Sequence, residues 1–111
     1  MRPVVDAFIA GDAAAVVELL GPEARFHSPV RTYEGPEVAR TVLAAVVQVI
    51  EDRKLTTIHE TPDETVAFFT GVLGDRPGEG VLRVREGELT LMVRPLKALL
   101  KGIEEMERLL G

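Results

Sequence analysis

The sequence has no cysteine, no long apolar run and no run of basic residues among its 111 positions. Without thiols, the chain excludes disulfides, thiolate nucleophiles and zinc–thiolate sites. No stretch approaches the roughly 18 apolar residues of a membrane-spanning helix, and the first residues do not form a basic-then-apolar signal segment. We therefore expect no membrane partner, and we expect the reducing cytoplasm, the default compartment for a chain without a signal.

The charge balance is also one-sided, with a net charge of −5, 28% charged residues and 46% hydrophobic residues. An acidic surface favours solubility and argues against a nucleic-acid or anionic-membrane partner. The length suits one domain and is too short for two. We therefore expect residues 1–111 to form a single domain, without a cofactor.

Apolar spacing and turn residues divide the chain into helices and strands. Helical spacing and stop signals predict helices over Pro3–Ala10, Ala13–Leu20 and Pro36–Asp52, and a last one beginning at Pro95. Strand composition between turn residues predicts strands over Ala24–Ser28, Leu55–Glu60, Thr65–Gly74, Gly80–Arg85 and Leu89–Arg94.

Consecutive strands joined by short turns indicate an antiparallel meander rather than crossover units. The long helix over Pro36–Asp52 carries an apolar stripe that needs a sheet to pack on. The predicted fold class is α+β. It is a cone in which a curved antiparallel sheet wraps around the long helix, with two N-terminal helices and a C-terminal helix.

The order of these elements and several short phrases resemble the nuclear-transport-factor-2-like superfamily, especially its SnoaL-like polyketide cyclase and ketosteroid isomerase branches. The phrases run through nearly the whole chain: Ala10-Gly11-Asp12, Phe26-His27-Ser28-Pro29-Val30, Gly35-Pro36-Glu37-Val38, Ile50-Glu51-Asp52 and Val93-Arg94-Pro95-Leu96. Each phrase is weak alone, and their shared order makes the fold resemblance fairly specific. A shared fold is not a shared function.

The resemblance implies where catalytic groups would stand. The isomerase branch uses a tyrosine on the first helix, an aspartate base beside the first-strand proline, and a protonated aspartate on the third meander strand. Carried over residue by residue, these places hold Val4, Ser28 and Gly80. The cyclases resemble the isomerases in having an acid near Gly80, and the Asp–Arg–Asp set of limonene epoxide hydrolases has no match here. The chain therefore lacks the family's acid–base groups, and we lean against an enzyme.

Side-chain alternation along the strands predicts which residues face the interior of the cone. The expected ligand-binding lining is almost entirely apolar, as in small-molecule clefts and also in plain cores. It comprises Phe26, Ser28, Tyr33, Leu43, Val47, Ala67, Phe69, Gly71, Leu82, Met92 and Arg94. The small Ala67 and Gly71 favour a void over a filled core.

The polar candidates have competing interpretations. Arg94 could anchor a ligand carboxylate, or it could be a strand-end arginine that pairs with an acidic neighbour. Tyr33 could line the cavity mouth or cover the start of the long helix. His27 has the wrong parity for the interior and His59 precedes a turn, which disfavours both as acid–base groups. With no spaced carboxylate partner they also make a poor metal site, so no metal is expected.

The last strand is apolar on both faces, which predicts a partner surface. By the same parity Val81, Leu89, Leu91 and Val93 face outward. An apolar face that a monomer would leave exposed to solvent predicts a homodimer with two-fold symmetry. Arg83 and Arg85 on this face could pair with glutamates across the interface.

Three functions follow from the sequence. The first is a dimeric domain that binds a small apolar molecule without the family's acid–base residues. The second is a small-molecule isomerase, cyclase or hydrolase that uses other residues. The third is a structural or interaction module whose cone is filled by its own side chains. The volume of the interior separates the first from the third.

Overall fold

The structure, a computed structural model, describes residues 1–110, with α4 side chains described at Leu96, Lys97, Leu99–Lys101, Glu104, Glu105 and Arg108. Gly111, the last residue of the expected single domain, lies outside the described residues. The helices are α1 (Arg2–Ala10), α2 (Ala13–Leu20), α3 (Pro36–Val49) and α4 (Leu96–Leu110). The strands are β1 (Arg25–His27), β2 (Thr32–Glu34), β3 (Ile50–Glu60), β4 (Thr65–Leu73), β5 (Arg76–Arg85) and β6 (Glu88–Arg94). No helix in this described part is long and apolar enough to cross a membrane.

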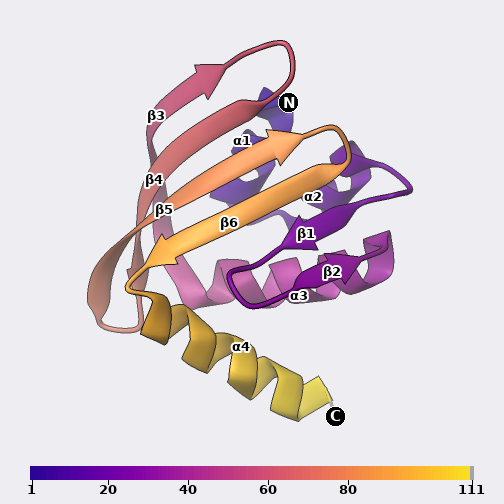
Figure 1. The fold of residues 1–111 in the computed structure, drawn as a ribbon. Helices are drawn as coiled ribbons and strands as arrows, with labels where there is room; N and C mark the ends of the chain where they lie inside the picture. Colours follow the sequence, from indigo (N-terminus) through magenta and orange to yellow (C-terminus); the bar gives the residue numbers. More distant parts are fainter. Residues whose placement is uncertain (111) are drawn as a thin grey trace.

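The strands form one six-stranded sheet in the order β2-β1-β6-β5-β4-β3. Neighbouring strands are antiparallel except β1 and β6, which pair in parallel. Figure 1 shows α1, α2 and α3 behind the curved sheet and α4 below the end of β6. The predicted α+β cone, with a curved sheet around the long helix, is confirmed.

Helix ends follow the signals in the sequence. Gly11 ends α1 in the left-handed conformation at φ 80°, which glycine adopts without a steric penalty. Asp12 then caps α2, because its carboxylate accepts a hydrogen bond from the amide of Ala15 at 3.0 Å. Pro36 occupies the first turn of α3, where its missing N–H would be unpaired in any case.

Curvature is concentrated in the β3–β4–β5 part of the sheet. Register shifts interrupt the β3–β4 ladder between Glu51 and Lys54 and between Leu55 and Thr57. Gly71 pairs directly with Gly78 across β4 and β5, so neither strand has a side chain there. Bulges and glycine pairs are the usual means of bending a sheet, and here they lie in its β3–β5 part.

Several element boundaries differ from the prediction, and β5 begins at Arg76 rather than Gly80. The long helix ends at Val49 rather than Asp52, and Ile50 already begins β3, five residues before Leu55. β2 was not predicted, because a strand of three residues is too short to show a period. Helix α3 therefore runs directly into the sheet, without a loop between the two elements.

The facing of β6 was predicted wrongly. Leu89, Leu91 and Val93 are buried, whereas Met92 and Arg94 are exposed. The physical reason is the two-residue turn at Glu86-Gly87, which pairs Arg85 with Glu88 and therefore places Leu91 opposite Leu82. Residues directly opposite in a sheet share a face, and Leu82 faces inward. Met92 and Arg94 consequently leave the expected lining, and Leu89, Leu91 and Val93 leave the expected partner surface.

Candidate functional site

The concave side of the sheet holds the residues predicted to line a pocket. Eight of the eleven are buried there or on the helix and strand that face it. They are Phe26 and Tyr33 on β1 and β2, Leu43 and Val47 on α3, Ala67, Phe69 and Gly71 on β4, and Leu82 on β5. These eight residues are thus gathered on one side of the sheet, and their burial is common to the lining of a pocket and to a plain core.

The ring of Phe69 occupies the centre of this side. A Cβ atom built on Gly80 would lie 2.3 Å from Cζ of Phe69, so the ring rests on the glycine backbone. Phe8 of α1 meets the same ring edge-on, with 5.5 Å between ring centroids. Phe69 is only 2% exposed. The space that Gly80 leaves empty is thus filled by a neighbouring side chain.

Gly71 repeats this arrangement nearby. A Cβ atom there would lie 2.8 Å from a methyl carbon of Ile50 and 3.1 Å from the carbonyl oxygen of Glu51. The prediction that small residues at Ala67 and Gly71 leave a void is therefore not supported at Gly71. Small residues in a core often permit a large neighbour to pack closely, and Ile50 does so here.

The places where the resemblance implied catalytic groups carry no acid or base. Val4 is buried in the α1 face of the core, and Gly80 lies beneath the Phe69 ring. Ser28 lies after β1, in the turn before β2, where its hydroxyl donates to the carbonyl oxygen of Arg31 at 2.9 Å. The same hydroxyl oxygen accepts hydrogen bonds from the amides of Val30 and Arg31. Ser28 therefore stabilises a turn and does not line the interior.

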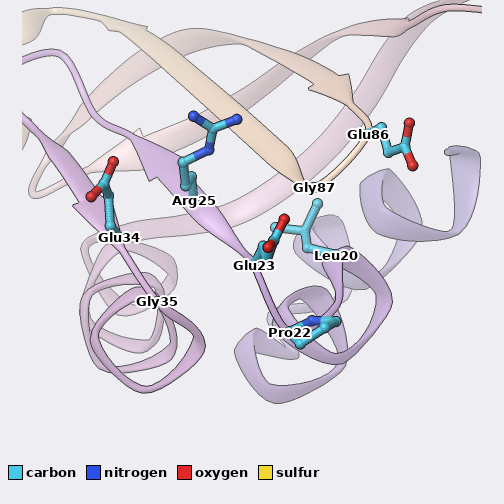
Figure 2. Close-up of a pocket in the computed structure, with 8 residues that line it drawn as sticks. All are labelled: Leu20, Pro22, Glu23, Arg25, Glu34, Gly35, Glu86 and Gly87. Carbon is cyan, nitrogen blue, oxygen red and sulfur yellow. The ribbon is translucent and has the colours of Figure 1, made fainter.

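The hollows on the molecule open at its surface. Figure 2 shows one of about 810 Å³ beside the end of α2, with Arg25 and Glu34 on neighbouring strands and Glu86 apart on the β5–β6 turn. Within the part of the chain that the structure describes, no His, Asp and Glu residues group closely enough to hold a metal ion. None of the described hollows includes Phe8, Phe26 or Leu43 in its lining.

The outer face of the sheet presents an apolar row across three strands. Phe68 of β4 pairs with Val81 of β5, and Val81 pairs with Met92 of β6. Phe68 is 42% exposed and Met92 is 53% exposed. A hollow of about 510 Å³ opens beside them and is lined partly by Thr57 and Arg94. In Figure 1 this face of β4–β6 is turned toward the viewer, and no helix of residues 1–110 lies over it.

Charged pairs flank the apolar row. On one side Arg83 and Arg85 both donate to the carboxylate of Glu64, at 2.6 and 3.0 Å. Hydrogen bonds from Arg83, and then from Arg85, lower the pKa of Glu64, and the bond to Glu64 raises the pKa of Arg83. On the other side Arg94 lies 3.6 Å from Glu79. Arg94 is thus a strand-end arginine paired with an acidic neighbour, and Arg83 and Arg85 pair within their own chain.

The two histidines lie outside the interior. His27 Nδ1 is 2.8 Å from the hydroxyl of Thr32, and its Nε2 is 3.4 Å from a carboxylate oxygen of Glu88, which also pairs with Arg25 at 2.8 Å. These contacts join β1, β2 and β6 on the outer face. His59 is exposed on β3 and meets Phe68 edge-on, with 6.3 Å between ring centroids.

Arg53 makes a half-buried connection between elements that no local signal in the sequence indicated. Its Nε donates to the carbonyl oxygen of Ile9 at 3.1 Å, and its Nη1 donates to the carbonyl oxygens of Val47 and Ile50. Desolvation lowers the pKa of this guanidinium. Arg53 thereby caps carbonyls of α1 and α3 together and fixes α1 against the start of β3. This role depends on a contact between residues that are 44 positions apart in the sequence, and no local pattern indicates such a contact.

Comparison with known proteins places the fold in a family. Residues 1–92 match the family model described as SnoaL-like domain. A steroid Δ-isomerase from Pseudomonas aeruginosa is similar at 28% identity and TM-score 0.78, over 96% of this chain and 85% of that one. An uncharacterised protein with a cystatin-like fold from Silicibacter pomeroyi has 22% identity and TM-score 0.82, over 95% and 85%.

A third similar structure is a hypothetical protein with a ketosteroid isomerase-like fold from Catenulispora acidiphila, in complex with trimethylamine. It has 16% identity and TM-score 0.65 and covers 91% of this chain and 92% of that one. No curated protein matches the chain at a significant level. At such identities the second and third similarities concern the fold alone.

Proposed function

This chain belongs to the SnoaL-like domain family, and we propose that it is a non-catalytic member that acts as an interaction module through its surface, with a cone filled by its own side chains. The observation that carries the proposal is the Phe69 ring, which lies on Gly80 where an open pocket would need space. The edge-on contact with Phe8 supports it from the helical side.

The chemistry of the interior also supports a non-catalytic role. Proton transfer in an isomerase or cyclase needs a positioned group of suitable pKa. Val4 and Gly80 offer no titratable atom, and the hydroxyl of Ser28 is engaged in its turn. We therefore expect no turnover of a β,γ-unsaturated ketosteroid above the buffer rate.

Binding of a small apolar molecule inside the cone is the second candidate. It is favoured by the 28% identity to a protein described as a steroid Δ-isomerase, over 96% of this chain. For this function Phe69 would have to leave Gly80 when the ligand enters. The two candidates therefore differ in whether the unmodified interior accepts an aromatic molecule.

A titration with the neutral fluorophore N-phenylnaphthylamine tests the proposal. The unmodified protein should show no saturable binding of this fluorophore. Phe69→Ala should bind benzene, measured by calorimetry, because a dry apolar cavity accepts such a ligand. Phe68→Ala is the matched control, since it removes the same ring from the outer face and should not bind benzene. Saturable binding of the fluorophore to the unmodified protein that survives in Phe68→Ala would contradict the filled cone and favour the ligand-binding candidate.

A further inference from the structure

The first bulge of β3 contains a residue in a strained conformation. Asp52 has φ 52°, and among the described residues it is the only one other than glycine with a positive φ. The β3–β4 ladder shifts register between Glu51 and Lys54, so β3 has one extra residue there. A strained residue persists only where the surrounding structure holds it, and bulges commonly redirect a side chain. Here the bulge turns the side chain of Arg53 toward the helices.

The guanidinium of Arg53 is the polar link between α1 and the sheet. Its Nε donates to the carbonyl oxygen of Ile9 at 3.1 Å. Among the hydrogen bonds of the described residues, no other joins α1 to the sheet or to α3. Gly11 gives the guanidinium room, because a Cβ atom there would lie 2.5 Å from Nη2 of Arg53. The link therefore requires an arginine at position 53 and a glycine at position 11.

Helix α1 covers the ring that fills the cone, and it lies behind the sheet in Figure 1. The buried side chains of α1 are all apolar, and one of them, Phe8, meets Phe69 edge-on with 5.5 Å between ring centroids. Apolar burial is not directional, so it favours contact without fixing the orientation of the helix. The orientation depends on the Arg53 bond and on the Gly11 turn that joins α1 to α2. Movement of α1 about that turn would take Phe8 away from Phe69.

We propose that α1 is a latched cover. It opens as a unit about the Gly11 turn and uncovers Phe69, and the hydrogen bond from Arg53 to Ile9 determines how often it opens. Proteins open locally in contiguous cooperative units, at a lower free energy than global unfolding requires. The inference goes beyond the proposed function, because it describes how the filled interior is kept closed.

Amide hydrogen exchange of the folded protein tests the latch. In Arg53→Met the amides of α1 should exchange about tenfold faster, because a hydrogen bond from a charged donor is lost, while the amides of β4 and β6 keep their rates. Arg83→Met is the matched control, since it removes a guanidinium that pairs with Glu64 at the surface, and it should leave α1 exchange unchanged. If Arg53→Met does not fold, Arg53→Lys keeps the charge without the planar fork and should show the same selective change.

Thiol labelling provides a second measurement, because the chain has no cysteine of its own. Val5 on α1 and Leu89 on β6 are both 0% exposed, so a cysteine at either position reacts only when its surroundings open. When Arg53→Lys is added, Val5→Cys should react about tenfold faster, and Leu89→Cys should keep its rate.

Three results would overturn the inference. Unchanged exchange and labelling of α1 would mean that Arg53 does not hold this helix. Equal acceleration at Val5→Cys and Leu89→Cys would mean that Arg53 only stabilises the whole fold. Faster exchange of α1 in Arg83→Met would mean that the effect is not specific to the latch.

Discussion

Two neighbouring phenylalanines show how differently the two faces of one sheet are used. Phe69 points to the concave side and is 2% exposed, whereas Phe68 points to the outer side and is 42% exposed. Phe69 meets Phe8 and lies on Gly80. Phe68 meets only the exposed His59 among the ring contacts described. The inner ring is thus covered by its own chain, whereas the outer ring remains exposed to solvent.

This difference has a simple origin in strand geometry. Side chains alternate across a strand, so adjacent residues of one type can have opposite energetic roles. On the inner face helices α1 and α3 supply the second layer that buries the sheet. On the outer face no helix of residues 1–110 supplies one. In this chain the inner face is covered by helices and by the Phe69 ring, whereas the outer face carries exposed apolar side chains.

The largest expected effect comes from truncating the inner ring. Phe69→Ala should lower the free energy of unfolding by about 3–5 kcal/mol, because it leaves a cavity between Phe8 and Gly80. Chemical denaturation followed by circular dichroism measures this loss. If that variant does not fold, Phe69→Leu should fold with a smaller loss, because leucine retains part of the apolar volume.

Phe68→Ala sharpens the comparison as the control. In dilute protein its cost should stay below about 1 kcal/mol, as for most surface substitutions. Equal losses for Phe69→Ala and Phe68→Ala would mean that the two faces are not used differently.

A smaller effect is expected at the charged rim of the outer face. The pKa of Glu64 is lowered by hydrogen bonds from Arg83 and Arg85, so its carboxylate stabilises the folded protein above the pKa of an unfolded glutamate, about 4.3. This contribution is lost as the pH falls through the lower folded pKa. In Glu64→Gln the free energy of unfolding should therefore fall less steeply on acidification than in the unmodified protein.

Glu60→Gln, at the exposed end of β3, is the control for this measurement. Between about pH 2 and pH 7, the midpoint of thermal unfolding of Glu60→Gln should change with pH as it does in the unmodified protein. An equal flattening in both variants would mean that the Arg83–Glu64–Arg85 contacts carry no particular stability. The effect is small because exposed ion pairs contribute little to folding.

Much of the fold could be predicted from sequence, because its signals are local. Glycine and proline placed most helix ends, and apolar composition found the four meander strands. β2 was missed because a strand of three residues is too short to show the alternation of a strand. The early start of β3 was missed because its first five residues follow directly on a helix and are likewise too few to show that alternation. The parallel pairing of β1 with β6 joins residues 63 positions apart, such as Arg25 and Glu88, and no local signal encodes it.

The interior was predicted in composition but not in shape. Buried positions on β4 and β5 were identified by alternation, yet Gly71, which suggested open space, lies against Ile50. Whether the interior is filled depends on the rotamers that its side chains adopt, and the spacing of residues in the sequence does not determine those rotamers. The facing of β6, by contrast, was available from the two-residue turn at Glu86-Gly87, which fixes the register.

Thiol labelling at two valines of β5 tests the central comparison most directly. Val84 is 1% exposed on the inner face, Val81 lies half-buried on the outer face, and the chain has no other thiol. Val84→Cys should react with a small thiol reagent only at the rate of unfolding, at any protein concentration. Val81→Cys should react much faster than Val84→Cys in the folded protein. Rapid labelling of Val84→Cys in the folded protein would contradict a filled interior, and equal labelling rates at the two positions would contradict the different use of the two faces.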